Sequence, residues 1–210
     1  MTWRGPAVVA ALLAMGAGGG FAVSWGLTEG ATGDGVAAPV AAQSPSLPID
    51  PVPDLLPDAR TPPLEPSVEL VRQRVGSGPF QMSVPAPKGW TFFTNSLNEW
   101  QWRPPDDADF GYYLRVEQVL SNRRSITWTL DNRIAELDED EDNMVVVERT
   151  EDSLHYTYVT SNHLRHGFLA WRDLTGSDNA QLEVAVTGRK VDVDGMSDLV
   201  ARVADGTRMD

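Results

Sequence analysis

Proline constrains the first third of this chain more strongly than any other feature. Nine prolines fall within residues 39–66. Each proline fixes its own φ angle and lacks an N–H donor, so the stretch can form neither a helix nor an inner strand. We expect a disordered, extended and semi-rigid stalk over residues 28–75. Leu55, Leu56 and Leu64 leave a second interpretation open, in which short apolar anchors dock on the domain that follows.

An apolar segment precedes the proline-rich linker. Residues 7–27 contain no charged side chain over 21 positions, about the length that crosses a hydrocarbon core of ~30 Å. Because Arg4 precedes the segment and acidic residues follow it, we expect residues 1–6 in the cytoplasm and a single transmembrane anchor. The alternative is a signal peptide cleaved at Ala22, which would release a secreted protein. Both interpretations place residues 76–210 outside the cytoplasm.

Charge and cysteine content exclude several classes of protein. The chain carries 30 acidic and 17 basic side chains, a formal net charge of -13. Nucleic-acid binding needs a clustered basic surface, so no nucleic-acid partner is expected. Contact with a membrane must come from the apolar segment, because no basic face is available. The chain has no cysteine, which excludes disulfides, thiolate nucleophiles, cysteine-bound metals and a lipid-modified cysteine.

The residue pattern changes to that of a folded domain near residue 76. Alternating apolar and polar positions predict eight strands, at residues 80–85, 90–94, 99–103, 112–120, 144–152, 154–161, 167–174 and 180–188. Helical spacing predicts helices over residues 125–137 and 196–204. Most strand connections are too short for a parallel crossover. The sequence therefore predicts an α+β fold for residues 76–210, with a mainly antiparallel sheet flanked by two helices.

Two large aromatic rings stand out in the predicted strand EWQWR. Trp100 and Trp102 point to one side of this strand, and Gln101 points to the other. This alternation is typical of a sheet with one buried face, so we expect both rings in the core. The alternative is an aromatic surface that recognises a partner or a cell-wall glycan. Trp128, on the first predicted helix, is a further candidate for such a partner-binding surface.

Motifs for catalysis, cofactors and metals are absent from the sequence. It contains no Gly-x-Ser-x-Gly elbow, phosphate-binding glycine loop or His-Glu-x-x-His pair. The acidic run 138–143 lacks the glycine and the final glutamate of a calcium-binding loop. Antiparallel pairing is expected to carry His155 away from His163 and His166, which argues against a metal site. We therefore predict no catalytic, cofactor-binding or metal-binding residues.

The segments GSGPFQMSVPAPKGW, EWQW, YYLRVEQV, LHYTYVT and AQLEVAVTGR, taken in order, resemble a known group of proteins. They are similar to the small exported domains of actinobacteria that form a PsbP-like α/β/α sandwich and are related to the LpqN-type proteins. The resemblance covers about residues 75–208 and includes neither the anchor nor the linker. It implies an extracytoplasmic binding or accessory module without known catalysis, and it assigns no functional residue.

These observations together predict a membrane-anchored, extracytoplasmic, non-enzymatic binding or scaffolding module without a cofactor. Its partner would be a protein or a cell-envelope component. A second hypothesis is a carrier or sensor for a small apolar or peptidic ligand, bound in a cavity lined by Trp90, Trp128 and Leu130. A third is a hydrolase that uses carboxylates such as Glu99 and those of residues 106–109.

Overall fold

The computed structural model describes residues 54–105, 111–119 and 123–210. Within these ranges the chain forms two α-helices, α2 (Ile126–Asp140) and α3 (Val193–Gly206), and ten strands in two antiparallel sheets. The predicted α+β class is confirmed. The predicted membrane segment 7–27 lies outside the described ranges, and no helix within them is long and apolar enough to cross a membrane.

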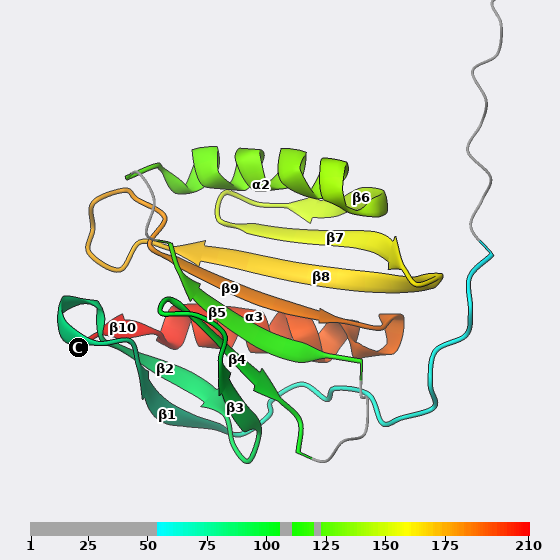
Figure 1. The fold of residues 1–210 in the computed structure, drawn as a ribbon, viewed down its shortest axis with the longest axis horizontal. Coiled ribbons are helices and arrows are strands. Elements are labelled where there is room, and N and C mark those ends of the chain that lie inside the picture. Colours follow the sequence, from blue (N-terminus) through cyan, green and yellow to red (C-terminus); the bar gives the residue numbers. More distant parts are fainter. Residues whose placement is uncertain (1–53, 106–110, 120–122) are drawn as a thin grey trace, which may run out of the picture. The chain divides into compact units, whose positions relative to one another are not determined.

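The larger sheet has seven strands in the order β3-β4-β5-β9-β8-β7-β6 (Figure 1). Their bounds are β3 (Thr91–Thr94), β4 (Glu99–Arg103), β5 (Tyr113–Gln118), β9 (Leu182–Gly188), β8 (His163–Arg172), β7 (Ser153–Thr160) and β6 (Asp142–Arg149). All eight strands that the sequence predicted are present, seven of them here. Short turns make β3–β4, β6–β7 and β7–β8 into hairpins, which fixes the antiparallel pairing.

The smaller sheet has β2 (Met82–Pro87) in its centre, between β1 (Leu70–Val75) and β10 (Arg208–Met209). Two one-turn 3₁₀ helices, η1 (Gly78–Phe80) and η2 (Lys190–Asp192), connect elements. Strand β1 lies within the stretch expected to be stalk, so the described domain begins before the predicted boundary at residue 76. Its side chains are mostly exposed, and this is why no apolar alternation marks it in the sequence.

Two hydrophobic cores lie on opposite faces of the larger sheet, one beside each α-helix. Neighbouring residues of one strand alternate between them: Ala170 of β8 belongs to the α3 core, whereas Leu169 and Trp171 belong to the α2 core. Helix α3 packs against β8, β9 and β2, and therefore lies between the two sheets. The two faces are called the α2 face and the α3 face below.

Residues 54–66 of the proline-rich linker lie against the domain, and we call them the strap. Arg189, at the start of η2, is buried and pairs with the fully buried Asp192 at 2.8 Å. Its guanidinium donates to three carbonyl oxygens of the strap, those of Ala59, Thr61 and Pro62, at 3.0, 3.2 and 3.0 Å. The buried guanidinium has more N–H donors than its carboxylate partner can accept. Main-chain carbonyls of the extended, proline-containing strap accept hydrogen bonds from the remaining donors.

Leu64 anchors the end of the strap. Its side chain is only 4 % exposed and belongs to the α3 core, and its N–H donates to Asp192 Oδ1 at 2.9 Å. Asp58 binds Arg165 of β8 at 2.5 Å. Leu55 and Leu56 remain exposed. The described part of the linker is thus docked through Leu64 and main-chain contacts, while residues 28–53 lie outside the described ranges.

Candidate binding pocket

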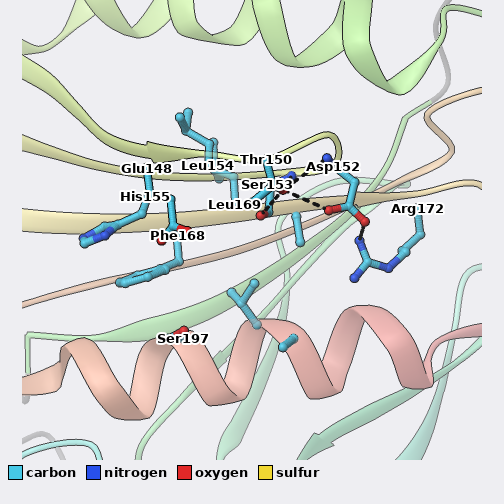
Figure 2. Close-up of a pocket in the computed structure, with 13 residues that line it drawn as sticks. Glu148, Thr150, Asp152, Ser153, Leu154, His155, Phe168, Leu169, Arg172 and Ser197 are labelled. Carbon is cyan, nitrogen blue, oxygen red and sulfur yellow. Dashed lines mark hydrogen bonds and ion pairs between the residues drawn. The ribbon is translucent and has the colours of Figure 1, made fainter.

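A pocket of about 240 Å³ lies between the β6–β7 hairpin and helix α3 (Figure 2). Its lining residues are Glu148, Thr150, Asp152, Ser153, Leu154, His155, Phe168, Leu169, Ala170, Arg172, Ser197, Val200 and Ala201. Figure 2 shows His155 and Phe168 together at one end, Asp152 with Arg172 at the other, and Ser197 on the helix beneath. The pocket therefore has both polar and apolar walls, as small ligand sites commonly do.

Small side chains on α3 and on the sheet leave the space open. Ser197 and Ala201 lie four residues apart, hence on one side of α3, and Ala170 and Ser153 are the small residues of the sheet that line the same space. Helix α3 packs against β8 and β9, whereas the β6–β7 hairpin extends the sheet further. The crevice between this extension and α3 is the pocket.

The turn that closes one end of the pocket is held by its own hydroxyl groups. Thr150 Oγ1 accepts hydrogen bonds from the N–H groups of Ser153 at 3.0 Å and Asp152 at 3.3 Å. This turn presents the Asp152 carboxylate to Arg172 at 2.7 Å. Arg172 also donates to Asp205 of α3 at 2.7 Å, so its guanidinium joins the turn to the helix. Two carboxylates thus compensate this cation.

A β-bulge in the edge strand β6 directs Glu148 toward the pocket. Val146 pairs with Tyr156 of β7 and Glu148 pairs with His155, so Val147 is an extra residue with no partner residue on β7. In a regular strand His155 would face Val147, and Glu148 would turn to the α2 face. The extra residue shifts the alternation by one position. As a result Glu148 shares the α3 face with His155 and lines the pocket.

His155 and His166 contact each other on the α3 face. His155 Nε2 lies 3.0 Å from His166 Nδ1, and the His155 ring stacks on Phe168 with ring centres 4.1 Å apart. The prediction that antiparallel pairing carries His155 away from the other histidines was wrong for His166. Thr157 is the residue opposite His166, and His155 is two positions along the same face, so the rings meet diagonally. Burial lowers the pKa of both histidines, which favours their neutral forms.

The contacts of the pocket do not make a nucleophile and base pair. His155 Nε2 is engaged by His166, and Ser153 Oγ lies 2.7 Å from Thr150 Oγ1. Covalent catalysis by serine requires its hydroxyl to be hydrogen-bonded to a base. In the part of the chain that the structure describes, no group of three or more histidine or carboxylate side chains could hold a metal ion. The arrangement is suited to binding through hydrogen bonds, charge and apolar contact.

The three tryptophans proposed as partner-binding residues lie apart from the pocket. Trp100 and Trp102 are 3 % and 1 % exposed and belong to the α3 core, as the strand alternation indicated. The Trp102 indole N–H donates to Gln73 of β1 at 2.9 Å, which ties the two sheets together. Trp128 on α2 is 47 % exposed, with the guanidinium of Arg124 over its ring at 4.5 Å. A partner-binding role for Trp128 stays a prediction.

The cavity expected between sheet and helix lies in a different place from the one observed. Leu130 fills the α2 core, and Trp90 packs against the α3 core. Neither these residues nor Trp128 line the pocket. Little in the sequence indicates the observed pocket. The bulge that brings Glu148 to the pocket and the pairing of distant strands are not visible in local alternation.

The carboxylates proposed for hydrolysis have other partners where the structure describes them. Glu99 of β4 lies 3.5 Å from Arg115 of β5, which also binds Glu117 at 2.8 Å and Glu183 of β9. Burial raises the pKa of Glu117, and the nearby Glu183 raises it further. Residues 106–109 lie outside the described ranges. Glu99, Glu117 and Glu183 thus surround one guanidinium instead of facing each other across a cleft.

Of the comparisons with known proteins, the one with solved structures found similar chains. No protein-family model matches the chain, and no curated protein matches it. Among solved structures, the crystal structure of LpqN, involved in cell envelope biogenesis of Mycobacterium tuberculosis, matches with a TM-score of 0.41 and 11 % sequence identity. The match covers 67 % of this chain and 91 % of that chain. A likeness at this level carries no argument about the family or the function of this chain.

Proposed function

We propose that this protein is a non-enzymatic binding module of the cell envelope that takes up part of a partner in the pocket between the β6–β7 hairpin and α3. The uncharged segment 7–27 would anchor it in the cytoplasmic membrane, with the domain outside. The partner would be an extracytoplasmic protein or an envelope component. On the basis of the sequence resemblance, we also propose that the domain is related to the exported PsbP-like domains of actinobacteria.

The single observation that carries this proposal is the mixed polar and apolar pocket at an exposed margin of the domain. Its volume of about 240 Å³ is below the ~300–1,000 Å³ of sites that enclose a drug-sized ligand. A side chain or a small group of a partner fits such a space better than a whole apolar ligand does. This favours a binding module over a carrier of apolar molecules.

The proposal is tested by filling the pocket without disturbing the core. Ala201 is exposed on α3 and lines the pocket, so Ala201→Trp should occupy the space. Ala135 is exposed on α2, away from the pocket, and Ala135→Trp is the matched control. The full chain and both variants are purified from crosslinked native membranes, and the components that follow them in stoichiometric amount are identified.

We expect a component that follows the wild-type chain and Ala135→Trp and is lost with Ala201→Trp. A chain truncated after Pro66 serves as the control for capture through the anchor and linker alone. Equal capture by all three full-length chains would contradict a role for the pocket. Thermal unfolding of both tryptophan variants checks that each domain remains folded.

A further inference from the structure

Carboxylates outnumber cations around the pocket. Glu148 and Asp152 line it, and Asp205 lies next to it through its bond to Arg172. Arg172 is the one cationic side chain among the lining residues, and Asp152 and Asp205 already occupy its donors. The exposed Glu148 side chain makes no ion pair or hydrogen bond with another side chain of the described ranges. Its charge is therefore available to an incoming group.

The remaining polar groups of the pocket do not repel a cation. Burial lowers the pKa of His155 more than the neighbouring Glu148 carboxylate raises it, which favours the neutral ring over a second positive charge in the pocket. Ser197 contributes a hydroxyl oxygen, which can accept a hydrogen bond from an ammonium or a guanidinium, whereas the Thr150 oxygen already accepts from two N–H groups of the turn. Phe168 contributes an apolar wall against which the carbon stem of such a group can pack. The lining thus matches an amphipathic cation.

The edge of the sheet beside the pocket is open to an extended segment. Strand β6 is the terminal strand, and within the described ranges its outer edge has no strand partner. Val145 and Val147 on this strand are 57 % and 53 % exposed. Extended peptides add to such edges through main-chain hydrogen bonds, while a pocket selects one of their side chains. A lysine or arginine of a partner is therefore one source of the cation, and a free amine is another.

We infer that the pocket recognises a compact cationic group, an ammonium or a guanidinium, through the Glu148 carboxylate that the β-bulge turns toward it. This inference rests on the proposed function and names the chemistry of the group that is bound. A cationic group gains the attraction of an uncompensated carboxylate, which a neutral group of the same shape does not. The formal net charge of -13 also attracts approaching cations.

The test compares charged and neutral probes of the same shape. Acetyl-valyl-lysyl-valine amide and its norleucine analogue represent an extended segment, and n-butylammonium chloride and n-butanol represent a free amine. Binding to the full chain is measured by calorimetry. We expect the lysyl peptide to bind about fivefold more tightly than the norleucyl peptide, the preference that one partly exposed ion pair gives. Added salt should reduce this preference.

Glu148→Gln should abolish the preference for the charged probe. Glu151→Gln is the matched control, because Glu151 is exposed on the same hairpin and does not line the pocket. A preference for butylammonium over butanol would support the inference with a free amine as a sufficient source. A preference confined to the peptides would support it with an extended segment as the source.

Three results would overturn the inference: equal binding of the lysyl and norleucyl peptides, an equal effect of Glu148→Gln and Glu151→Gln, or no binding of any probe. The proposed function is judged separately, from capture by the Ala201→Trp chain. If Ala201→Trp loses the partner while the cationic probes show no preference, the pocket binds something else and only the cation is wrong. If Ala201→Trp captures the partner normally, the proposed function itself fails.

Discussion

Gly195→Ala should detach the strap from the domain. A Cβ atom on Gly195 of α3 would lie 1.9 Å from the carbonyl oxygen of Leu64 and 2.8 Å from its Cγ. The first of these atoms is main chain and cannot rotate away, so the strap must move. Leu64 would lose its burial, worth about 2 kcal/mol. The N–H bond from Leu64 to the buried Asp192 carboxylate would be lost as well, at about 2 kcal/mol.

Alanine also favours a helix over glycine by up to about 1 kcal/mol, so the net loss should be about 3 kcal/mol. The free energy of unfolding is measured by urea titration with tryptophan fluorescence, and hydrogen exchange reports on residues 54–66. Ser197→Ala, at an exposed position of the same helix, is the control and should change stability by less than about 0.5 kcal/mol. A Gly195→Ala chain that is as stable as the wild type would show that the strap contributes little to the fold.

Three further predictions concern the core and the buried polar groups. Trp100→Ala should lower the free energy of unfolding by about 3 to 5 kcal/mol, whereas Trp128→Ala should change it by less than about 0.5 kcal/mol, both by urea titration. Because burial lowers the pKa values of His155 and His166 in the folded state, the stability that depends on their neutral forms is present above about pH 6.5 and is lost as the pH falls through the lowered pKa values. Replacing both histidines with glutamine should therefore flatten the decline in stability between about pH 7.5 and pH 5.5, and an unchanged pH profile would contradict this reading. Arg189→Met leaves its carboxylate partner buried and unpaired, and should cost about 3 to 5 kcal/mol in the same titration.

The secondary structure followed from the sequence where each residue faces one environment. The alternation in strands such as 99–103 and the helical spacing of residues 125–137 report directly on a buried and an exposed face. For this reason eight strands and both helices were predicted at nearly the observed places. Strand β1 was missed because it is an edge strand with mostly exposed side chains. The two-residue strand β10 is too short to show any periodicity.

The candidate site depended on features that local patterns do not contain. The bulge at Val147 reverses the face to which Glu148 belongs, and regular alternation would assign it to the α2 face. The contact between His155 and His166 depends on the register of β7 against β8, which the turn sets and the apolar pattern does not specify. The docking of the strap depends on Arg189, more than a hundred residues further along the chain. The sequence left docking through Leu64 open as an alternative, and Leu64 is indeed buried, but no local pattern indicated the contacts with Arg189.

The most direct test of the pocket as the binding site is hydrogen exchange of the full chain with and without the component captured from native membranes. We expect slower exchange at residues 148–155 on the hairpin and 197–201 on α3, with little change over β3 and β4. Protection confined to Trp128 and its neighbours on α2, or to β3 and β4, would contradict binding in the pocket. Partner binding would then belong to another surface of the domain.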